Sequence, residues 1–260
     1  MAKIGLVSFQ NSWNTINNAT RWNLFKQIRT FALNNNVTYL LFSGSTLFDK
    51  KTQSDKSVEK IVNKVGLFFK KFSIIFEMNN ERILKNKVPP YGLYAFEKGK
   101  KKLGPVCQLL ATSKAPKSLY EELWRQIQSN ERTVSLNRKK FLILICGELN
   151  ILHNCQNDNN RVDGLRYQFG GGSIRSVKYD VLFNPTHTPL KAMYGKYKNR
   201  LKYMSERADG RMAFLNFNVP RNQKRRNAAF IAYKEGKEIV RKNEEREDWS
   251  NGWAVRIIEC

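Results

Sequence analysis

Short apolar runs alternate with amphipathic stretches through the first eighty residues. The runs at residues 3–9, 37–44 and 73–78 are mostly apolar, as buried strands are. Between them, apolar residues recur at helical spacing, first in residues 15–36 and then in residues 57–72. This pattern predicts strand, helix, strand, helix, strand, the order typical of an α/β protein.

The rest of the chain adds hairpins to this alternation. Residues 91–114 predict a hairpin with its turn at 97–101, and residues 227–244 predict a second one with its turn at 234–237. No repeat or linker interrupts the pattern, so we expect one α/β domain over residues 1–260. The other predicted elements are a helix at 118–128, strands at 140–146, 178–185, 212–218 and 252–259, and a basic helix at about 194–209.

Charge is the unusual bulk property of this chain. Lysine and arginine total 46 against 22 aspartate and glutamate, which gives a net charge of +24. Such a field attracts phosphate polymers, although a solvated surface alone would carry the same charges. We therefore expect nucleic acid or another polyanion as a possible partner. The candidate contacts lie in the basic helix and in a basic cluster after it: Lys196, Lys198, Arg200, Arg221, Lys224, Arg225 and Arg226.

Composition limits the cellular locations and the cofactors that we expect for this chain. No apolar run approaches the length of a membrane span, and the first residues lack the pattern of an export signal. Four cysteines in 260 residues are too few for a disulfide framework, so we expect reduced thiols and a cytoplasmic protein without membrane contact. Cys146, His153 and Cys155 lack a second pair at ligand spacing, so we expect no metal and no cofactor.

The most informative stretch is "LICGEL", which ends at Leu149. An apolar run enters Cys146 and is followed at once by Gly147 and Glu148. A buried thiol at a strand end is one interpretation. A nucleophile at the carboxyl edge of a sheet is the other.

The order of elements and motifs resembles the nitrilase, or carbon-nitrogen hydrolase, superfamily over essentially the whole chain. "LICGEL" is similar to that family's Cys-x-Asp/Glu-Leu pattern, "DVLFNPTHTP" to its strand with an Asn-Pro-Ser/Thr signature, and "RADGRMAFLNFN" to its Arg-Ala helix end and following strand. The resemblance implies a four-layer α-β-β-α sandwich in a single domain. It also implies a homodimer paired through outer helices.

The resemblance also implies roles for individual residues. Cys146 would attack a nitrile or amide carbon and form a thioester, and Lys114 in "LLATSKAP" stands where the family's lysine holds the oxyanion. Glu148 would orient the loop by accepting backbone hydrogen bonds. His187 and Asn184 would line the substrate pocket, and a cysteine–histidine pair would have to use His187 or the chain's other histidine.

One family residue is absent. The family's Phe-Pro-Glu motif, which supplies the catalytic carboxylate, corresponds here to Phe42, Ser43 and Gly44. Without a base, a thiol with a pKa near 8.5 stays mostly protonated at neutral pH, and the lost proton transfer costs about 10²–10⁴-fold in rate. Glu77, at the end of the third strand, could lean into the same pocket, but a salt-bridged rim position is the alternative. Glu148 is a weaker candidate base.

Three functions therefore remain open from sequence. The first is a cysteine hydrolase of carbon–nitrogen bonds whose base is altered, with amidase activity changed or lost. The second is a catalytically inactive pseudoenzyme that binds DNA or RNA through its basic surface. The third is an enzyme that acts on a carbon–nitrogen bond of a nucleic acid or nucleotide.

Overall fold

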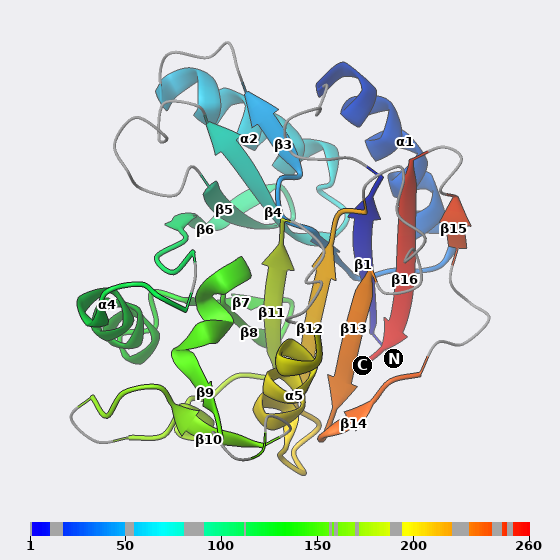
Figure 1. The fold of residues 1–260 in the computed structure, drawn as a ribbon. Coiled ribbons are helices and arrows are strands. Elements are labelled where there is room, and N and C mark those ends of the chain that lie inside the picture. Colours follow the sequence, from blue (N-terminus) through cyan, green and yellow to red (C-terminus); the bar gives the residue numbers. More distant parts are fainter. Residues whose placement is uncertain are drawn as a thin grey trace.

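The structure is a computed structural model. It describes residues 2–10, 18–49, 55–80, 91–111, 113–155, 158, 161–169, 172–187, 194–219, 229–240, 246–248 and 252–260. Two β-sheets form its centre, and helices lie on the outer side of each (Figure 1).

The first sheet contains both ends of the described chain. Its strands run in the order β15-β16-β1-β2-β4-β5-β6, and β3 pairs with β4 beside this path. The strands β1, β2 and β4 are parallel, so their carboxyl ends meet at one edge of the sheet. The bounds are β1 Lys3–Phe9, β2 Tyr39–Phe42, β3 Leu47–Asp49, β4 Ser73–Asn80, β5 Tyr91–Glu97, β6 Lys100–Cys107, β15 Arg246–Asp248 and β16 Trp253–Glu259.

The second sheet runs in the order β14-β13-β12-β11-β8-β7. Its central strands β8, β11 and β12 are parallel, so the residues that follow them also meet at one edge. The bounds are β7 Thr133–Leu136, β8 Lys139–Ile143, β11 Val181–Thr186, β12 Met212–Phe217, β13 Phe230–Lys234 and β14 Lys237–Glu238. A separate ribbon pairs β9 Leu152–Asn154 with β10 Val162–Leu165.

The helices cover the outer faces of the two sheets. They are α1 Asn18–Asn34, α2 Asp55–Phe68, α4 Lys117–Gln128 and α5 Tyr194–Ser205, with short 3₁₀ helices at Cys146–Ile151 and Ile174–Ser176. In α1, Phe25 packs edge-on against Phe42 of β2 at 5.6 Å between ring centroids, and Phe69, just after α2, lies 5.4 Å from both rings. Through these contacts α1 and the end of α2 pack against the first sheet.

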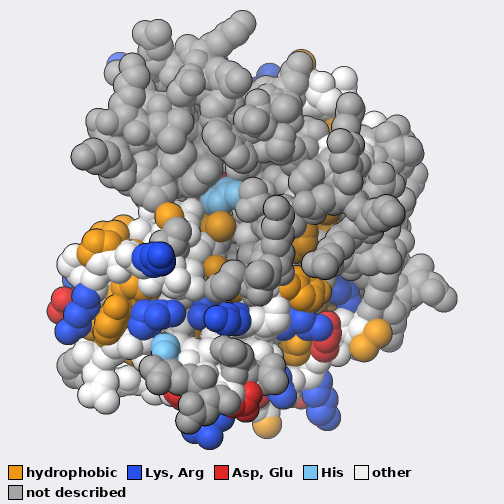
Figure 2. Space-filling view, viewed as in Figure 1, with side chains coloured by type: hydrophobic (Ala, Val, Ile, Leu, Met, Phe, Trp, Pro, Cys, Tyr) orange, Lys and Arg blue, Asp and Glu red, His pale blue; other side chains and the backbone are white. Residues whose placement is uncertain are grey.

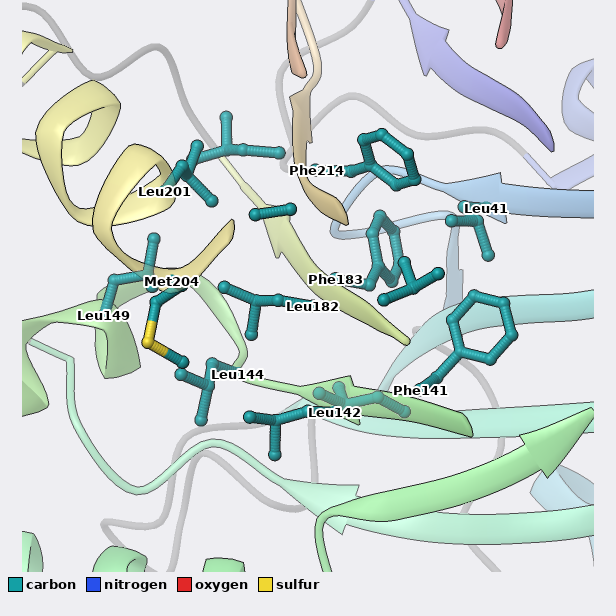
Figure 3. Packing of buried hydrophobic residues seen from close by; sticks show 14 of the residues in the cluster. Leu41, Phe141, Leu142, Leu144, Leu149, Leu182, Phe183, Leu201, Met204 and Phe214 are labelled. Atoms are coloured by element: carbon teal, nitrogen blue, oxygen red, sulfur yellow. The ribbon is translucent and has the colours of Figure 1, made fainter. Parts of the chain in front are cut away.

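The second core lies between the sheets and under α5. Successive residues of a strand point to opposite faces, so Phe183 of β11 faces Leu41 of the first sheet while Leu182 faces α5 (Figure 3). On the helix side, Leu201 and Met204 of α5 close over Leu182. The expected four-layer α-β-β-α sandwich is confirmed.

Side-chain amides join the two sheets at the edge where the parallel strands end. Asn216 Nδ2 of β12 donates to the carbonyl oxygens of Val7 and Leu41, at 2.8 Å each. Asn218 Nδ2 donates to the carbonyl of Gly44 at 2.6 Å, and Gly44 N–H donates to the carbonyl of Thr186 at 3.2 Å. The loop after β2 is therefore held against the end of β11.

Most predicted elements agree with the structure, with two kinds of exception. The basic helix ends at Ser205 rather than near residue 209. The short strands β3, β7, β9 and β10 were not predicted, because each offers three or four residues with few apolar positions. Among the described residues, no helix has the length and apolar character needed to cross a membrane.

Candidate active site

Cys146 lies at a sharp reversal of the chain. The buried strand β8 ends at Ile143, and Cys146 begins the 3₁₀ helix with a φ of +45°. A non-glycine residue in this left-handed region is uncommon, and such residues often occur at functional sites. The half-buried thiol therefore stands at the carboxyl edge of the second sheet, on a strand-to-helix turn of the kind that presents nucleophiles.

A buried carboxylate holds this turn in place. Glu148 is fully buried and accepts hydrogen bonds from the N–H of Ile145 at 2.7 Å and of Leu109 at 2.6 Å. It also pairs with buried Arg132 at 3.0 Å. Burial raises the pKa of Glu148, whereas Arg132 and the two amides favour its charged form. These contacts agree with the predicted orienting role, and because they use both oxygens, we do not expect Glu148 to act as a base for Cys146.

Asn184 also supports the turn from β11. Its amide Nδ2 donates to the carbonyls of Leu144 and of Cys146, the latter at 3.1 Å, and its Oδ1 accepts from Thr186 Oγ1 at 2.9 Å. The side chain is fully buried and both ends of the amide are engaged. These contacts support the turn at Cys146, and a contact of Asn184 with a substrate remains a prediction.

Histidine and glutamate meet beside the thiol. His187 follows β11 directly, and its Nε2 lies 2.7 Å from Oε2 of Glu77, which stands in β4 of the other sheet. Glu77 is fully buried and also accepts the N–H of Ser45 at 2.6 Å. It is therefore an interior partner of a histidine rather than a rim residue. The imidazole also forms a hydrogen bond with Cys146, so His187 lies between Glu77 and Cys146.

The electrostatics of this trio favour a charged imidazole. Burial lowers the pKa of His187, but the negative charges of Glu77 and Cys146, together with hydrogen bonds to both, raise it well above its usual value. A protonated imidazole beside sulfur stabilises the thiolate, which is the nucleophilic form of cysteine.

The space for His187 exists because position 44 has no side chain. A Cβ on Gly44 would lie 2.7 Å from Cδ2 of His187 and 2.9 Å from the carbonyl carbon and oxygen of Thr186. A glutamate at this position would displace the imidazole. The residue that departs from the family motif is thus the one that admits the histidine.

Lys114 lies in the turn before α4, and its residue is exposed. The preceding main chain packs closely on the turn that begins at Cys146, called the nucleophile turn below after the predicted role of this residue: a Cβ on Gly147 would lie 2.4 Å from the carbonyl oxygen of Leu110 and 2.5 Å from that of Ala111. The structure therefore places the segment that precedes Lys114 beside the turn at Cys146, and the catalytic role of Lys114 remains a prediction.

The candidate nucleic-acid contacts separate into three groups. Lys196 is half-buried, and Lys198 forms an ion pair with Glu238 at 2.8 Å. Arg200 is 2% exposed and donates to Asn150 and Asn154, so its assignment to a nucleic-acid surface is wrong. Figure 2 shows lysine and arginine side chains in a band across the lower half of one face. The remaining candidates, Arg221, Lys224, Arg225 and Arg226, lie outside the described residues.

The pairing of a histidine with a glutamate was not predicted from the sequence. The pairing of His187 with Glu77 joins residues 110 positions apart, and no local pattern reveals it. Two features of the sequence could have indicated this pairing. A glycine stands in place of the expected acid, and one of the chain's two histidines follows the Asn-Pro-Thr motif. Within the described part of the chain, no group of three or more potential metal ligands occurs.

The sequence matches no protein-family model and no curated protein. Solved structures nevertheless share its fold. The chain aligns with a carbon-nitrogen hydrolase from Helicobacter pylori G27 at a TM-score of 0.54 and 8% identity, covering 98% of this chain and 88% of that one. Nit3 of Saccharomyces cerevisiae, a member of branch 10 of the nitrilase superfamily, aligns at 0.52 and 10% identity, with 98% and 90% covered.

Two further solved structures with this fold are a longer protein and an amidase variant with a covalent adduct. A glutamine-dependent NAD(+) synthetase from Cytophaga hutchinsonii aligns at a TM-score of 0.54 and 12% identity, covering 99% of this chain and 42% of that longer one. A glutamate-to-leucine variant of the amidase from Nesterenkonia sp. AN1 aligns at 0.56 and 8% identity, with 99% and 90% covered. That structure shows covalent addition of the acetamide moiety of fluoroacetamide at its active-site cysteine. This chain therefore has the nitrilase-like fold.

Proposed function

We propose that this chain, which has the nitrilase-like fold, is a cysteine hydrolase that cleaves the carbon–nitrogen bond of an amide through Cys146, His187 and Glu77. The contact of His187 with both Glu77 and Cys146 is the observation that supports this function. It supplies the proton acceptor that the absent family glutamate would otherwise provide.

Each residue has a defined role in the proposed reaction. The Cys146 sulfur attacks the amide carbon, and His187 carries the thiol proton to the leaving nitrogen, so that an amine departs and a thioester remains. Water then attacks the thioester while His187 takes its proton, and the carboxylic acid and thiol are released. Glu77 keeps the imidazole in position and stabilises its positive charge, as the acid of a Ser-His-Asp triad does.

The test must separate thiol reactivity from turnover. The amidase variant described above lacks a glutamate and still forms a covalent adduct, so alkylation alone does not demonstrate hydrolysis. We would measure ammonia or amine release from a panel of simple amides and trap the Cys146 thioester by mass spectrometry. The proposal predicts release that disappears in Cys146→Ala and falls by about 10²-fold or more in His187→Gln. Release that survives Cys146→Ala would refute it.

We propose polyanion binding as a second function, supported by the net charge of +24 and the basic band in Figure 2. Lys196 and exposed Lys202 of α5 are the described residues best placed for phosphate contacts. This function is compatible with hydrolysis, because Arg200 of the same helix turns inward towards the nucleophile turn.

A further inference from the structure

Two guanidinium groups converge on the helix that follows the nucleophile. Arg166 Nε, just after β10, donates to the carbonyl oxygen of Asn150 at 3.1 Å. Arg200 of α5 donates from Nη1 to Oδ1 of the same asparagine at 2.7 Å, and from Nε to Asn154 at 2.9 Å. Two cations from different elements are therefore fixed on one residue, four positions after Cys146.

Asn150 connects these cations to the reactive turn. Its Nδ2 donates to the carbonyl of Gly147 at 2.8 Å and lies 3.4 Å from the hydroxyl of Tyr197. Burial first, and then the charge of Cys146, raise the pKa of Tyr197, so this phenol lies within the field of the nucleophile. The guanidinium groups, the phenol and the thiol therefore belong to one neighbourhood.

The positive charge here has no acidic partner among the described residues. Every ion pair of Arg125, Arg132 and Arg175 involves a glutamate, whereas Arg166 and Arg200 form none in the described part of the chain. Burial lowers the pKa of Arg200 to about 10, and the charge of Arg166 acts in the same direction. A buried cation without a counter-charge is costly, and a bound anion would offset that cost.

A neighbouring donor also lacks a partner. The hydroxyl of Tyr120 in α4 is buried and makes no hydrogen bond within the described structure. The guanidinium carbon of Arg166 lies 5.9 Å from the centre of its ring. Buried hydroxyl groups are normally satisfied, so this one indicates a polar ligand that completes the cluster.

We infer that the substrate carries an anionic oxygen group, a carboxylate or a phosphate, which binds beside Cys146 between Arg166 and Arg200. Arg166 offers its two terminal nitrogens, which have no partner among the described residues, and Tyr120 offers its hydroxyl. This inference rests on the proposed function and names the substrate class of the same site: amides whose scissile bond lies near a negative charge.

Charged and neutral alkylating reagents provide a direct test. We would follow carboxymethylation of Cys146 by iodoacetate and carbamidomethylation by iodoacetamide, using peptide mapping, and normalise the ratio of the two rates to that of 2-mercaptoethanol. The inference predicts a normalised ratio above one that falls by about three-fold or more in Arg166→Gln, because one nearby charge is lost.

The matched control is Arg138→Gln. Arg138 lies in the turn before β8, at the far end of that strand from Cys146. The separation is about 20 Å, beyond the Debye length of about 8 Å at physiological salt, so the ratio should not change. A wild-type ratio no higher than that of the reference thiol, or an equal ratio in Arg166→Gln, would overturn the inference.

Protection by simple anions and the absolute reactivity of Cys146 are also diagnostic. Protection of Cys146 from iodoacetamide by inorganic phosphate but not by acetate would support a phosphate-bearing substrate, and the reverse would support a carboxylate. If Cys146 reacts with neither reagent, the proposed hydrolase fails and this inference fails with it. If Cys146 reacts with both reagents without charge preference, only the anionic substrate is excluded.

Discussion

The imidazole of His187 occupies the space that a side chain on Gly44 would need. A Cβ atom on Gly44 would lie 2.7 Å from Cδ2 of His187, far inside van der Waals contact. The glycine at position 44 and the histidine after β11 are therefore structurally linked, because the imidazole needs the space that the glycine leaves open. Glu77 contacts the same imidazole from β4.

Replacing Gly44 by alanine should damage the site directly. The new methyl group would push His187 away from Cys146 or displace the main chain of Thr186. We expect turnover to fall by about 10²-fold or more and stability to drop by about 1–3 kcal/mol. Amide hydrolysis rates and urea denaturation would measure the two effects.

Gly195→Ala is the matched control for that substitution. Gly195 is the second residue of α5, and apart from the helix's own backbone no atom of the described residues lies within 4 Å of the Cβ that would be added there. Turnover should stay unchanged and stability should stay equal or rise by up to about 1 kcal/mol. Equal losses in both variants would show that the contact with His187 is not what matters.

Local pattern was sufficient to predict the nucleophile turn. "KFLILICGEL" joins an apolar strand to a glycine and a buried acid, and each of these has a role within the turn itself. The triad could not be predicted in the same way. Glu77 and His187 come from different sheets, and each belongs to an ordinary strand end when taken alone.

The raised pKa of His187 has a consequence for stability. Its folded value lies well above the unfolded value of about 6.5, so the protonated folded state is favoured. The resulting stabilisation is complete below pH of about 6.5 and is lost as pH rises through the folded pKa. The difference in unfolding free energy between the wild type and His187→Gln should therefore shrink from pH 6 towards alkaline pH of about 9. Urea titrations across this range test it; a difference that grows with pH would contradict the assignment.

Glu148 should be the acid most important for stability. Glu148→Gln leaves Arg132 buried without its counter-charge, which should cost about 3–5 kcal/mol. Glu131→Gln removes a carboxylate from an exposed ion pair with Arg125 and should have little effect. Denaturation midpoints distinguish the two cases, and similar midpoints would contradict the buried network.

The burial of Arg200 in the basic helix also could not be predicted from the sequence. Arg200 was assigned to the surface from the charge pattern, yet it is buried on the same stripe as Tyr197 and Met204. Its spacing of three and four residues from these apolar positions was visible in the sequence. The burial of an arginine could not be inferred, because it depends on acceptors from β9 and the nucleophile turn.

Polyanion binding should depend on salt in a residue-specific way. If Lys196 contacts phosphate, Lys196→Gln should lower the slope of log affinity against log salt by about one for a mixed-sequence oligonucleotide. Lys70→Gln removes an exposed charge near the end of α2, on the other side of the sandwich, and should leave the slope unchanged. Fluorescence anisotropy across salt concentrations measures both. Absent or salt-independent binding would remove this function.

The most direct test of the triad is an NMR titration, which is simple because the chain holds only His153 and His187. We predict one histidine that titrates well above its usual pKa and moves to lower pH in both Glu77→Gln and Cys146→Ala, because each variant removes a negative charge that raises the pKa of His187. The other histidine should not respond. Two histidines that titrate at ordinary pH, and that ignore both substitutions, would contradict the account.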